Sequence, residues 1–443
     1  MQKQPRQAPA AFREGARGRR LSQKGGLPRT PFTKPMNELL NSLRWFVEEE
    51  RVLACLTVTG GTKDEERHAG CGRIREKEAS GEDVDMPENA LFDLASLTKL
   101  FTALTTLRLR DEGLLDLQQP VTTYAPQFKN LWKTSVETVL TFGAALLTPK
   151  RVDAQPDREA GLRELFQITA QPQGNGRFYS DMHAMVLKYI IEGAAGESYF
   201  DCLRKRILLP LGMNDTWAQV PESERFRAAS CDMEHRIEGE KWISRAGVEP
   251  GTVHDPKARL LSMGGRDLCG HAGLFSTRAD MTRFCQGVLK ELVVSRESLR
   301  FMAQNRTGRP LPAGGYTQYL GCQCYVKHPD QYFSEIPVYM SDQAFGLSGF
   351  TGHHLAIDPE QGIFSLFLGD RVLNRLTVLV PSQGKSFTDF GLNAAGYGSL
   401  TWPDGHNVFS SANYVHQKDA RLHAPLARLM GWEPWRKAGS EWP

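Results

Sequence analysis

Strand-like segments lie at both ends of this chain of 443 residues, and a long helix-rich stretch separates them. Residues 36–50 place apolar side chains at helical spacing, and residues 52–61 and 67–75 have the composition of two strands joined by a turn. Strand patterns return after residue 315, at 316–326, 350–358 and 362–370. Because a sheet must bury one face against another layer, this order predicts an α+β fold with a central antiparallel sheet that carries terminal helices.

The middle of the chain is dominated by helical patterns. Leucines recur near the helical period from Leu97 onward, and Gly113 is a typical stop for that helix. Similar patterns cover residues 180–196 and 280–292. We therefore expect a mostly helical subdomain, at roughly residues 100–290, inserted between the two halves of the sheet.

Two terminal segments differ from this body. Residues 1–35 hold nine Lys or Arg, a single acid (Glu14) and few apolar side chains. Such a segment cannot bury enough surface to offset its ordering entropy, so we expect a disordered basic head, with a targeting segment as the alternative. The whole chain carries +3 and the head +8, which leaves −5 for the rest. Residues 36–380 are interpreted as one domain, and 381–443 as a C-terminal extension packed on it.

The composition argues against several classes of protein. A net charge of +3 gives no reason to expect nucleic-acid binding, and no run of about 18 apolar residues could span a bilayer. Eight scattered cysteines without a C-x-x-C pair indicate reduced, packed thiols and a cytoplasmic protein. No metal-ligand motif, P-loop or dinucleotide fingerprint occurs, so we expect neither a metal nor a cofactor.

Ser96-Leu97-Thr98-Lys99 is the main chemical signal, because residues three apart share one face of a helix. A Ser hydroxyl needs a base to take its proton, and a Lys amine can serve where its surroundings lower its pKa. A second S-x-x-K, Ser382 to Lys385, lies in PSQGKSF, where Pro and Gly argue against a helix. We therefore select Ser96 as the candidate nucleophile and reject Ser382.

Two further motifs contain residue types that suit the same chemistry. Tyr179-Ser180-Asp181 precedes a helix, and a Tyr phenol near a Lys can shuttle protons, although a packing Tyr followed by a helix cap is the alternative. Ser348 and Gly349 lie in FGLSGFTG (345–352), where small residues on an edge strand let a substrate approach the backbone. The alternative there is a Gly-rich strand with a bulge.

Longer phrases surround these motifs: LFDLASLTKLFTAL, RFYSDMHAMVLKYIIEGAAG and VHDPKARLLSMGGRDLCGHAGLFSTRADMTRFC. In this order, over residues 37–380, the chain resembles the serine β-lactamase family with its penicillin-binding-protein and esterase relatives. The resemblance implies a β-lactamase/transpeptidase-like fold with the site between sheet and helical subdomain. It implies that Ser96 is acylated, Lys99 accepts its proton and Tyr179 assists proton transfer. Asp181 would contact substrate at a position where many relatives have Asn.

The third motif departs from the family pattern. The resemblance implies an oxyanion hole made by the N–H groups of Ser96 and Phe350, but relatives have Lys or His where this chain has Leu347. His353 shares the strand face of Leu347, but six residues of extended chain would place it about 20 Å away. No local replacement for the missing cation is therefore expected.

These departures set the predicted function. Residues 138–152 also lack a stretch common among relatives, so both changes touch the walls of the cleft. We expect a serine hydrolase that acts on a small ester or amide, more esterase-like than a true β-lactamase. An acyltransferase with a non-water acceptor, or a non-catalytic binding protein with the same fold, are the alternatives. His271, His254 and Asp255 are assigned to hydrogen bonding within loops.

Overall fold

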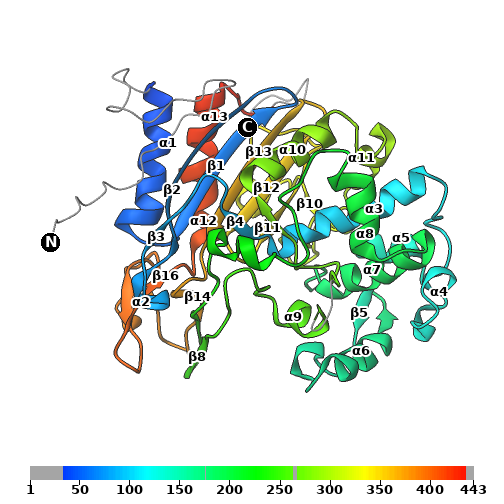
Figure 1. Cartoon of the computed structure of the whole chain (residues 1–443), viewed down its shortest axis with the longest axis horizontal. Coiled ribbons are helices and arrows are strands. Elements are labelled where there is room, and N and C mark those ends of the chain that lie inside the picture. The colour runs from blue at the N-terminus through cyan, green and yellow to red at the C-terminus, as the bar shows by residue number, and fades with distance from the viewer. Residues whose placement is uncertain (1–32, 175, 263–266, 436–443) are drawn as a thin grey trace.

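The computed structural model describes residues 33–174, 176–262 and 267–435 (Figure 1). The predicted basic head falls outside these ranges except for its last residues. Lys34 and Pro35 already belong to α1 (Lys34–Arg44), because proline suits the first helical turn, where no N–H partner is needed. None of the helices in the described ranges is both long and apolar enough to cross a bilayer.

The main sheet confirms the predicted antiparallel arrangement. Its strand order is β10-β11-β12-β13-β1-β2-β3, and each neighbouring pair runs antiparallel. The strands are β10 (Tyr325–Val326), β11 (Phe345–Gly349), β12 (His353–Asp358), β13 (Ile363–Asp370), β1 (Cys55–Thr62), β2 (Glu66–Arg75) and β3 (Val84–Asp85). Strands from both ends of the domain therefore meet at β1 and β13, and the helical middle is inserted between them.

Helices cover both faces of this sheet (Figure 1). On one face, α1 and α13 (Ala424–Met430) pack side by side, and their apolar side chains share a buried cluster with β1, β2 and β13. On the other face, α10 (Arg278–Leu289) contacts β1, β12 and β13. The segment expected as a C-terminal extension thus supplies a helix that covers the central strands.

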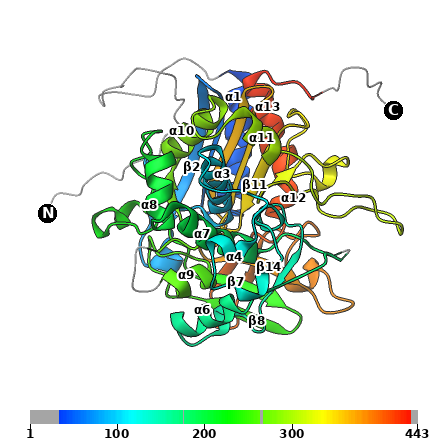
Figure 2. The same ribbon diagram turned by 90° about the vertical axis from the view of Figure 1, so that its right-hand side faces the viewer.

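The remaining helices form the inserted part of the chain. In the view turned by 90° about the vertical axis, α7, α4 and α6 lie below α3 (Figure 2). They are α3 (Thr98–Asp111), α4 (Val121–Tyr124), α5 (Val136–Leu140), α6 (Arg158–Phe166), α7 (Asp181–Ala195), α8 (Tyr199–Leu203), α9 (Pro256–Ser262) and α11 (Arg296–Met302). Single-turn helices are α2 (Lys77–Ser80) and α12 (Tyr414–Lys418). The helices expected from the patterns at 97–113, 180–196 and 280–292 are confirmed as α3, α7 and α10.

A second sheet was not anticipated from the sequence. Its order is β15-β16-β14-β7-β8, formed by β7 (Glu234–Glu238), β8 (Lys241–Arg245), β14 (Arg375–Val380), β15 (Ser399–Thr401) and β16 (Asn407–Ser410). Strand β14 runs parallel to both β7 and β16. Two small pairs complete the strands, β4 (Leu91–Asp93) with β9 (Phe275–Thr277) and β5 (Ala145–Leu147) with β6 (Thr169–Gln171). The second sheet joins three distant segments of the chain.

Two strand predictions need correction. Most of residues 316–326 form loops, and only Tyr325–Val326 pairs with the sheet. Residues 350–352 are a turn rather than extended chain, so β11 and β12 form a hairpin. The eight cysteines are buried free thiols, which confirms their predicted packing.

Candidate active site

Ser96 lies in a tight 3₁₀ turn, Ala95–Leu97, between β4 and α3. Ala95 has φ +46°, a left-handed conformation that costs a residue with a Cβ about 1–2 kcal/mol. The Asp93 carboxylate holds the turn by accepting the N–H of Ala95 at 2.9 Å, and the hydroxyl of Thr351 donates to the Asp93 carbonyl at 2.8 Å. Ser96 is partly exposed between buried neighbours, so its hydroxyl is reachable from solvent.

Lys99 is fully buried one helical turn later and points at the Ser96 hydroxyl. Its Nζ lies 2.9 Å from Ser96 Oγ, 3.2 Å from the carbonyl oxygen of His271 and 2.8 Å from Asp181 Oδ1. These three acceptors match the three N–H bonds of an ammonium group. The one-turn spacing of the motif therefore brings the hydroxyl and the amine together as expected.

The charge of Lys99 differs from the expectation of a neutral amine. Burial alone would lower the pKa of Lys99, but the Asp181 carboxylate and the Tyr179 side chain together outweigh burial and raise it above the ordinary lysine value. Burial would likewise raise the pKa of Asp181, yet the charges of Lys99, His271 and Lys257 hold it well below its usual range. Lys99 is therefore an ammonium group in this site.

Asp181 lines the cavity of the candidate site, and its carboxylate pairs with two lysines. It sits at the start of α7, after the Ser180 cap whose hydroxyl accepts the N–H of Met182, and its carboxylate faces Lys99 and Lys257. The Nζ of Lys257 is 3.1 Å from Asp181 Oδ2. Many relatives have Asn, a neutral amide, at this position. Here a carboxylate stands there and pairs with Lys99 and Lys257.

The aromatic ring of Tyr179 lies close to the Lys99 amine. The Lys99 Nζ lies 5.0 Å from the centre of the Tyr179 ring, and Tyr325 stacks on the same ring at 5.7 Å between centres. Gln318 accepts the backbone N–H of Tyr179 at 3.0 Å, which fixes the segment before α7. The structure thus brings Ser96, Lys99 and Tyr179 around one point.

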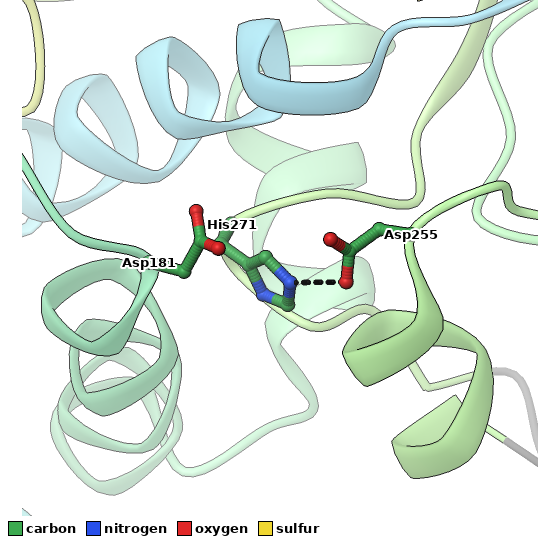
Figure 3. Close-up of side chains that lie close together, drawn as sticks. All are labelled: Asp181, Asp255 and His271. Atoms are coloured by element: carbon green, nitrogen blue, oxygen red, sulfur yellow. Dashed lines mark hydrogen bonds and ion pairs between the residues drawn. The ribbon is translucent and has the colours of Figure 1, made fainter. Parts of the chain in front are cut away.

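Asp181, His271 and Asp255 form a polar cluster beside this point (Figure 3). His271 Nε2 lies 2.9 Å from Asp255 Oδ1, and its Nδ1 lies 2.7 Å from the carbonyl oxygen of Cys269. His271 also presents the backbone oxygen that accepts from Lys99. The residues assigned to loop hydrogen bonding do form loop contacts, and they also line the candidate site.

The same cluster has the residue types of a metal site, because its three ligand atoms lie within 4.8 Å of one another. However, the Nζ of Lys257 lies 3.1 Å from Asp181 and 3.5 Å from Asp255, and Lys99 also pairs with Asp181. These ammonium groups already balance the carboxylates, and a metal ion would have to displace Lys257. The donor set does not fit a resident metal.

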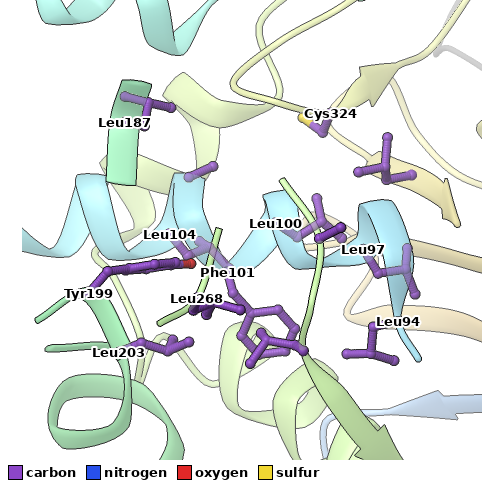
Figure 4. Close-up of a cluster of buried hydrophobic side chains, with 14 of the residues drawn as sticks. Leu94, Leu97, Leu100, Phe101, Leu104, Leu187, Tyr199, Leu203, Leu268 and Cys324 are labelled. Carbon is purple, nitrogen blue, oxygen red and sulfur yellow. The ribbon is translucent and has the colours of Figure 1, made fainter. Parts of the chain in front are cut away.

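Buried packing keeps α3 in place (Figure 4). The labelled side chains come from the nucleophile turn and α3, from α7 and α8 and from two loops: Leu94, Leu97, Leu100, Phe101, Leu104, Leu187, Tyr199, Leu203, Leu268 and Cys324. The Thr102 hydroxyl adds a 2.7 Å hydrogen bond to the Tyr199 phenol. Such packing restricts the rotamers of Ser96 and Lys99, since close-packed interiors leave little free volume.

Strand β11 approaches the nucleophile turn closely. A Cβ at Gly349 would lie 2.9 Å from the Leu94 carbonyl oxygen, so only glycine allows this approach. Phe350 follows the strand, and the structure records no acceptor for its N–H among the described residues. Both Ser96 and Phe350 line one cavity, which suits the expected oxyanion hole.

The cation missing at position 347 has a counterpart from the end of the chain. Leu347 is fully buried in the core. The Lys418 Nζ, from α12, lies 2.7 Å from Ser348 Oγ and 2.8 Å from Glu335 Oε2. No sequence pattern pointed to Lys418 or Glu335, because both lie in segments without clear periodicity.

The expected separation of His353 from this motif is wrong. Because β11 and β12 form a hairpin, His353 lies opposite Gly349 and His354 opposite Ser348. His354 Nδ1 is 3.2 Å from Ser348 Oγ. The estimate of about 20 Å assumed a continuous strand, whereas the turn at 350–352 folds the chain back.

The Lys418–Glu335 pair allows a prediction on stability. Lys418→Met is expected to lower the free energy of unfolding by about 3 kcal/mol, because it leaves a largely buried carboxylate unpaired. Lys418→Met combined with Glu335→Gln should regain most of that loss. Urea denaturation of the three proteins measures both effects, and equal stability of Lys418→Met and the parent would contradict the account.

One cavity of about 950 Å³ connects these groups. Its lining includes Ser96, Tyr179, Asp181 and the end of β11, Ser348 to Phe350. It continues along residues 146–153, the wall at which the sequence departs from its relatives, and reaches the second sheet. The volume is that of a small-molecule site.

Comparisons with known proteins find a matching family model and several similar chains. Residues 57–382 match a family model described as Beta-lactamase. The chain is 28% identical over 305 residues to N-acetylmuramyl-L-alanine amidase of Bacillus subtilis (strain 168), covering 62% of this chain and 66% of that protein. It is 26% identical over 241 residues to a beta-lactamase of Escherichia coli (strain K12), covering 53% of this chain and 57% of that protein. The matches thus span less than two thirds of each of these relatives.

A solved structure of low sequence identity shares the fold. The octameric penicillin-binding protein homologue from Pyrococcus abyssi superimposes with a TM-score of 0.59 at 19% identity, covering 90% of this chain and 78% of that one. At this identity the likeness concerns the arrangement of sheet and helices. Together with the family match, it supports the fold expected from the three ordered motifs.

Proposed function

This chain belongs to the beta-lactamase family, and we propose on that premise that it is a serine hydrolase which forms an acyl ester on Ser96. The substrate is a small ester or amide. The observation that carries the proposal is the 2.9 Å contact between Lys99 Nζ and a solvent-reachable Ser96 Oγ at the cavity wall. A binding protein that merely kept the fold would have no need for this contact beside a strained turn.

The positive charge of Lys99 determines which residue can accept the proton of Ser96. An ammonium group that donates to Ser96 cannot also take its proton, so we assign the acceptor role to the Tyr179 oxygen. Ser96 Oγ then bonds to the substrate carbonyl carbon while its proton moves to the Tyr179 oxygen. Tyr179 returns that proton to the leaving group as the carbon–leaving-group bond breaks.

The second half of the reaction uses the same groups. Water gives a proton to the Tyr179 oxygen and attacks the acyl carbon, and the proton returns to Ser96 as the ester bond breaks. Lys99 stabilises the negative charge that develops on Ser96 and on the Tyr179 oxygen in both steps. The N–H groups of Ser96 and Phe350 would stabilise the oxyanion of each tetrahedral intermediate.

An esterase-like specificity fits the β11 side of the cavity better than β-lactam hydrolysis. Leu347 is buried, and Lys418, which approaches Ser348 instead, is neutralised by Glu335 at 2.8 Å. Neither side chain offers an uncompensated positive charge on β11. Strand β11 therefore does not require a substrate with a carboxylate beside the scissile bond.

Asp181→Asn tests the role of Lys99 through pH dependence. Without the Asp181 charge, burial remains and lowers the pKa of Lys99, so the amine loses its proton at a lower pH than in the parent. We expect kcat/KM of the variant to fall about tenfold as the pH rises through that value, because the ammonium is lost. The parent should show no such fall in this range, since Asp181 keeps the pKa of Lys99 raised.

The control for that profile is Asp153→Asn, which removes a carboxylate of the same cavity that pairs with Arg151 at 2.6 Å. It should leave the shape of the profile unchanged. Activity of Asp181→Asn that rises with pH through the same range would instead assign Lys99 as the base.

Pre-steady-state kinetics test the proposed function itself. Mixing the protein with excess 4-nitrophenyl butyrate should release a burst of nitrophenol close to one equivalent, followed by slower turnover. The burst reports the acyl ester and the slower phase its hydrolysis. Absence of both burst and turnover for a series of activated esters and amides would count against the hydrolase proposal.

A further inference from the structure

The lining of the cavity has a different charge from the rest of the domain. Seven Lys or Arg and four Asp or Glu line it, although the chain beyond residue 35 has a net charge of −5. The basic residues are Lys150, Arg151, Arg177, Arg236, Arg245, Lys257 and Arg371. This excess of three positive charges favours ligands of negative charge.

Arg236 and Arg245 come from the second sheet. Alternate residues of β7 point to opposite faces, and Ile237 packs into the apolar cluster on the far face, so Arg236 faces the cavity. Glu234 accepts from Arg245 at 3.3 Å but lies 3.9 Å from Arg236 Nε, and the Nη2 of Arg236 instead pairs with Glu238 at 3.1 Å. The Nε of Arg236 is buried and has no hydrogen-bond partner in the described part of the protein.

Arg371 reaches the same end of the cavity from the loop after β13. It is 7% exposed, and its guanidinium donates to the carbonyl oxygens of Thr377 at 2.6 Å and Ser411 at 3.0 Å. It forms no ion pair with any carboxylate in the described residues. Burial lowers its pKa to about 10, a sign of how poorly this charge is compensated. Burying a cation without a counter-ion is costly unless a ligand supplies the opposite charge.

We propose that Arg236, Arg245 and Arg371 bind an oxyanionic group, a carboxylate or a phosphate, at the end of the substrate away from the scissile bond. This inference rests on the proposed hydrolase function and names its substrate class. Guanidinium groups suit both anions because they offer paired N–H donors. We call these three residues the arginine wall.

The arginine wall adjoins the acylation site through Phe350. The Arg371 guanidinium lies 5.4 Å from the centre of the Phe350 ring, and His254 stacks on the same ring at 5.6 Å. His254 Nε2 in turn lies 3.1 Å from Glu234. An anion on the wall and a carbonyl at the Phe350 N–H therefore belong to one extended ligand, whose charge is met by side chains from β7, β8 and the loop after β13.

Matched esters test this inference by turnover. The 4-nitrophenyl monoester of glutaric acid carries a free carboxylate, its methyl diester is a neutral control, and a third ester ends in a phosphate. We expect KM about tenfold lower for an anionic ester than for the neutral one, at similar kcat. The ester with the lower KM shows whether the wall prefers a carboxylate or a phosphate. Equal KM values for all three esters would overturn the inference.

Arg236→Gln combined with Arg245→Gln should raise KM for the preferred anionic ester about tenfold and leave the neutral ester unchanged. Arg236→Lys with Arg245→Lys keeps the charge and should retain part of the preference, which separates binding from misfolding. Arg428→Gln is the matched control, because Arg428 also pairs with a carboxylate, Glu38, but lies on α13. Unchanged discrimination in a folded double Gln variant would contradict the inference.

A binding measurement separates this inference from the proposed function. Calorimetry with the Ser96→Ala protein needs no turnover and compares glutaric acid monoanilide with its methyl ester. Tighter binding of the anion, lost in the double Gln variant, supports the arginine wall even if no ester is hydrolysed. Equal binding of the two anilides, in a protein that does hydrolyse neutral esters, rejects the wall and leaves the hydrolase proposal intact.

Discussion

Ser96→Ala is expected to reduce kcat/KM for an activated ester by about 10⁴-fold, because the acyl ester can no longer form. The reaction that remains would come from binding and the oxyanion hole alone. The stability of the protein should change little, since Ser96 is partly exposed and its hydroxyl contacts only Lys99 among the described residues. Nitrophenol release and thermal unfolding measure the two quantities.

Ser382→Ala is the matched control, because Ser382 and Lys385 repeat the same spacing. Their side chains both contact Glu240 in an exposed loop, at 2.6 and 3.4 Å, and Ser382 does not line the cavity that contains Ser96. Full activity is therefore expected for this variant. A comparable loss in both Ser→Ala proteins would show that the change does not report on the proposed nucleophile.

Lys99→Met is expected to reduce kcat/KM by about 10³-fold, because it removes both the buried positive charge beside Tyr179 and the hydrogen bond to Ser96. The variant should fold, since Lys257 still pairs with Asp181 at 3.1 Å. Lys385→Met should keep the parent activity. Steady-state kinetics of the two variants test the prediction directly.

A second variant separates catalysis from structure. Lys99→Met combined with Asp181→Asn removes both charges of the pair, and should regain stability without regaining activity. If the double variant recovered the parent turnover, the ammonium of Lys99 would be a structural rather than a catalytic group.

The elements nearest the nucleophile could be predicted from sequence because their signals are local. Helix α3 combines a leucine period with a glycine stop, and the Ser96–Lys99 spacing follows from helical geometry alone. The same holds for α7, which begins at its serine cap and ends at Gly196 in the left-handed conformation. The fold class followed from the order of strands and helices.

The charge of Lys99 could not be predicted in the same way. Burial was foreseeable from the apolar run around Lys99, and burial alone indicates a neutral amine. The opposite result depends on Asp181, which lies 82 positions away in the chain and 2.8 Å away in space. Only the packing of α7 against α3 reveals which effect is larger.

The residues at the second-sheet end of the cavity could not be predicted from the sequence for a related reason. Strands β7 and β8 are short and polar on one face, and β14, which pairs with β7, follows more than 100 residues later. Lys418 and the arginine wall depend on this long-range pairing and on the hairpin at 350–352. A strand period without its turn gives a wrong distance, as the expected position of His353 shows.

Trapping the acyl site covalently tests the central claim most directly. The protein is treated with a fluorophosphonate, digested, and its peptides are analysed by mass spectrometry. The account predicts one adduct, on the peptide that contains Ser96, which is present in Ser382→Ala and absent in Ser96→Ala. An adduct on another residue, or labelling that persists unchanged in Ser96→Ala, would contradict it.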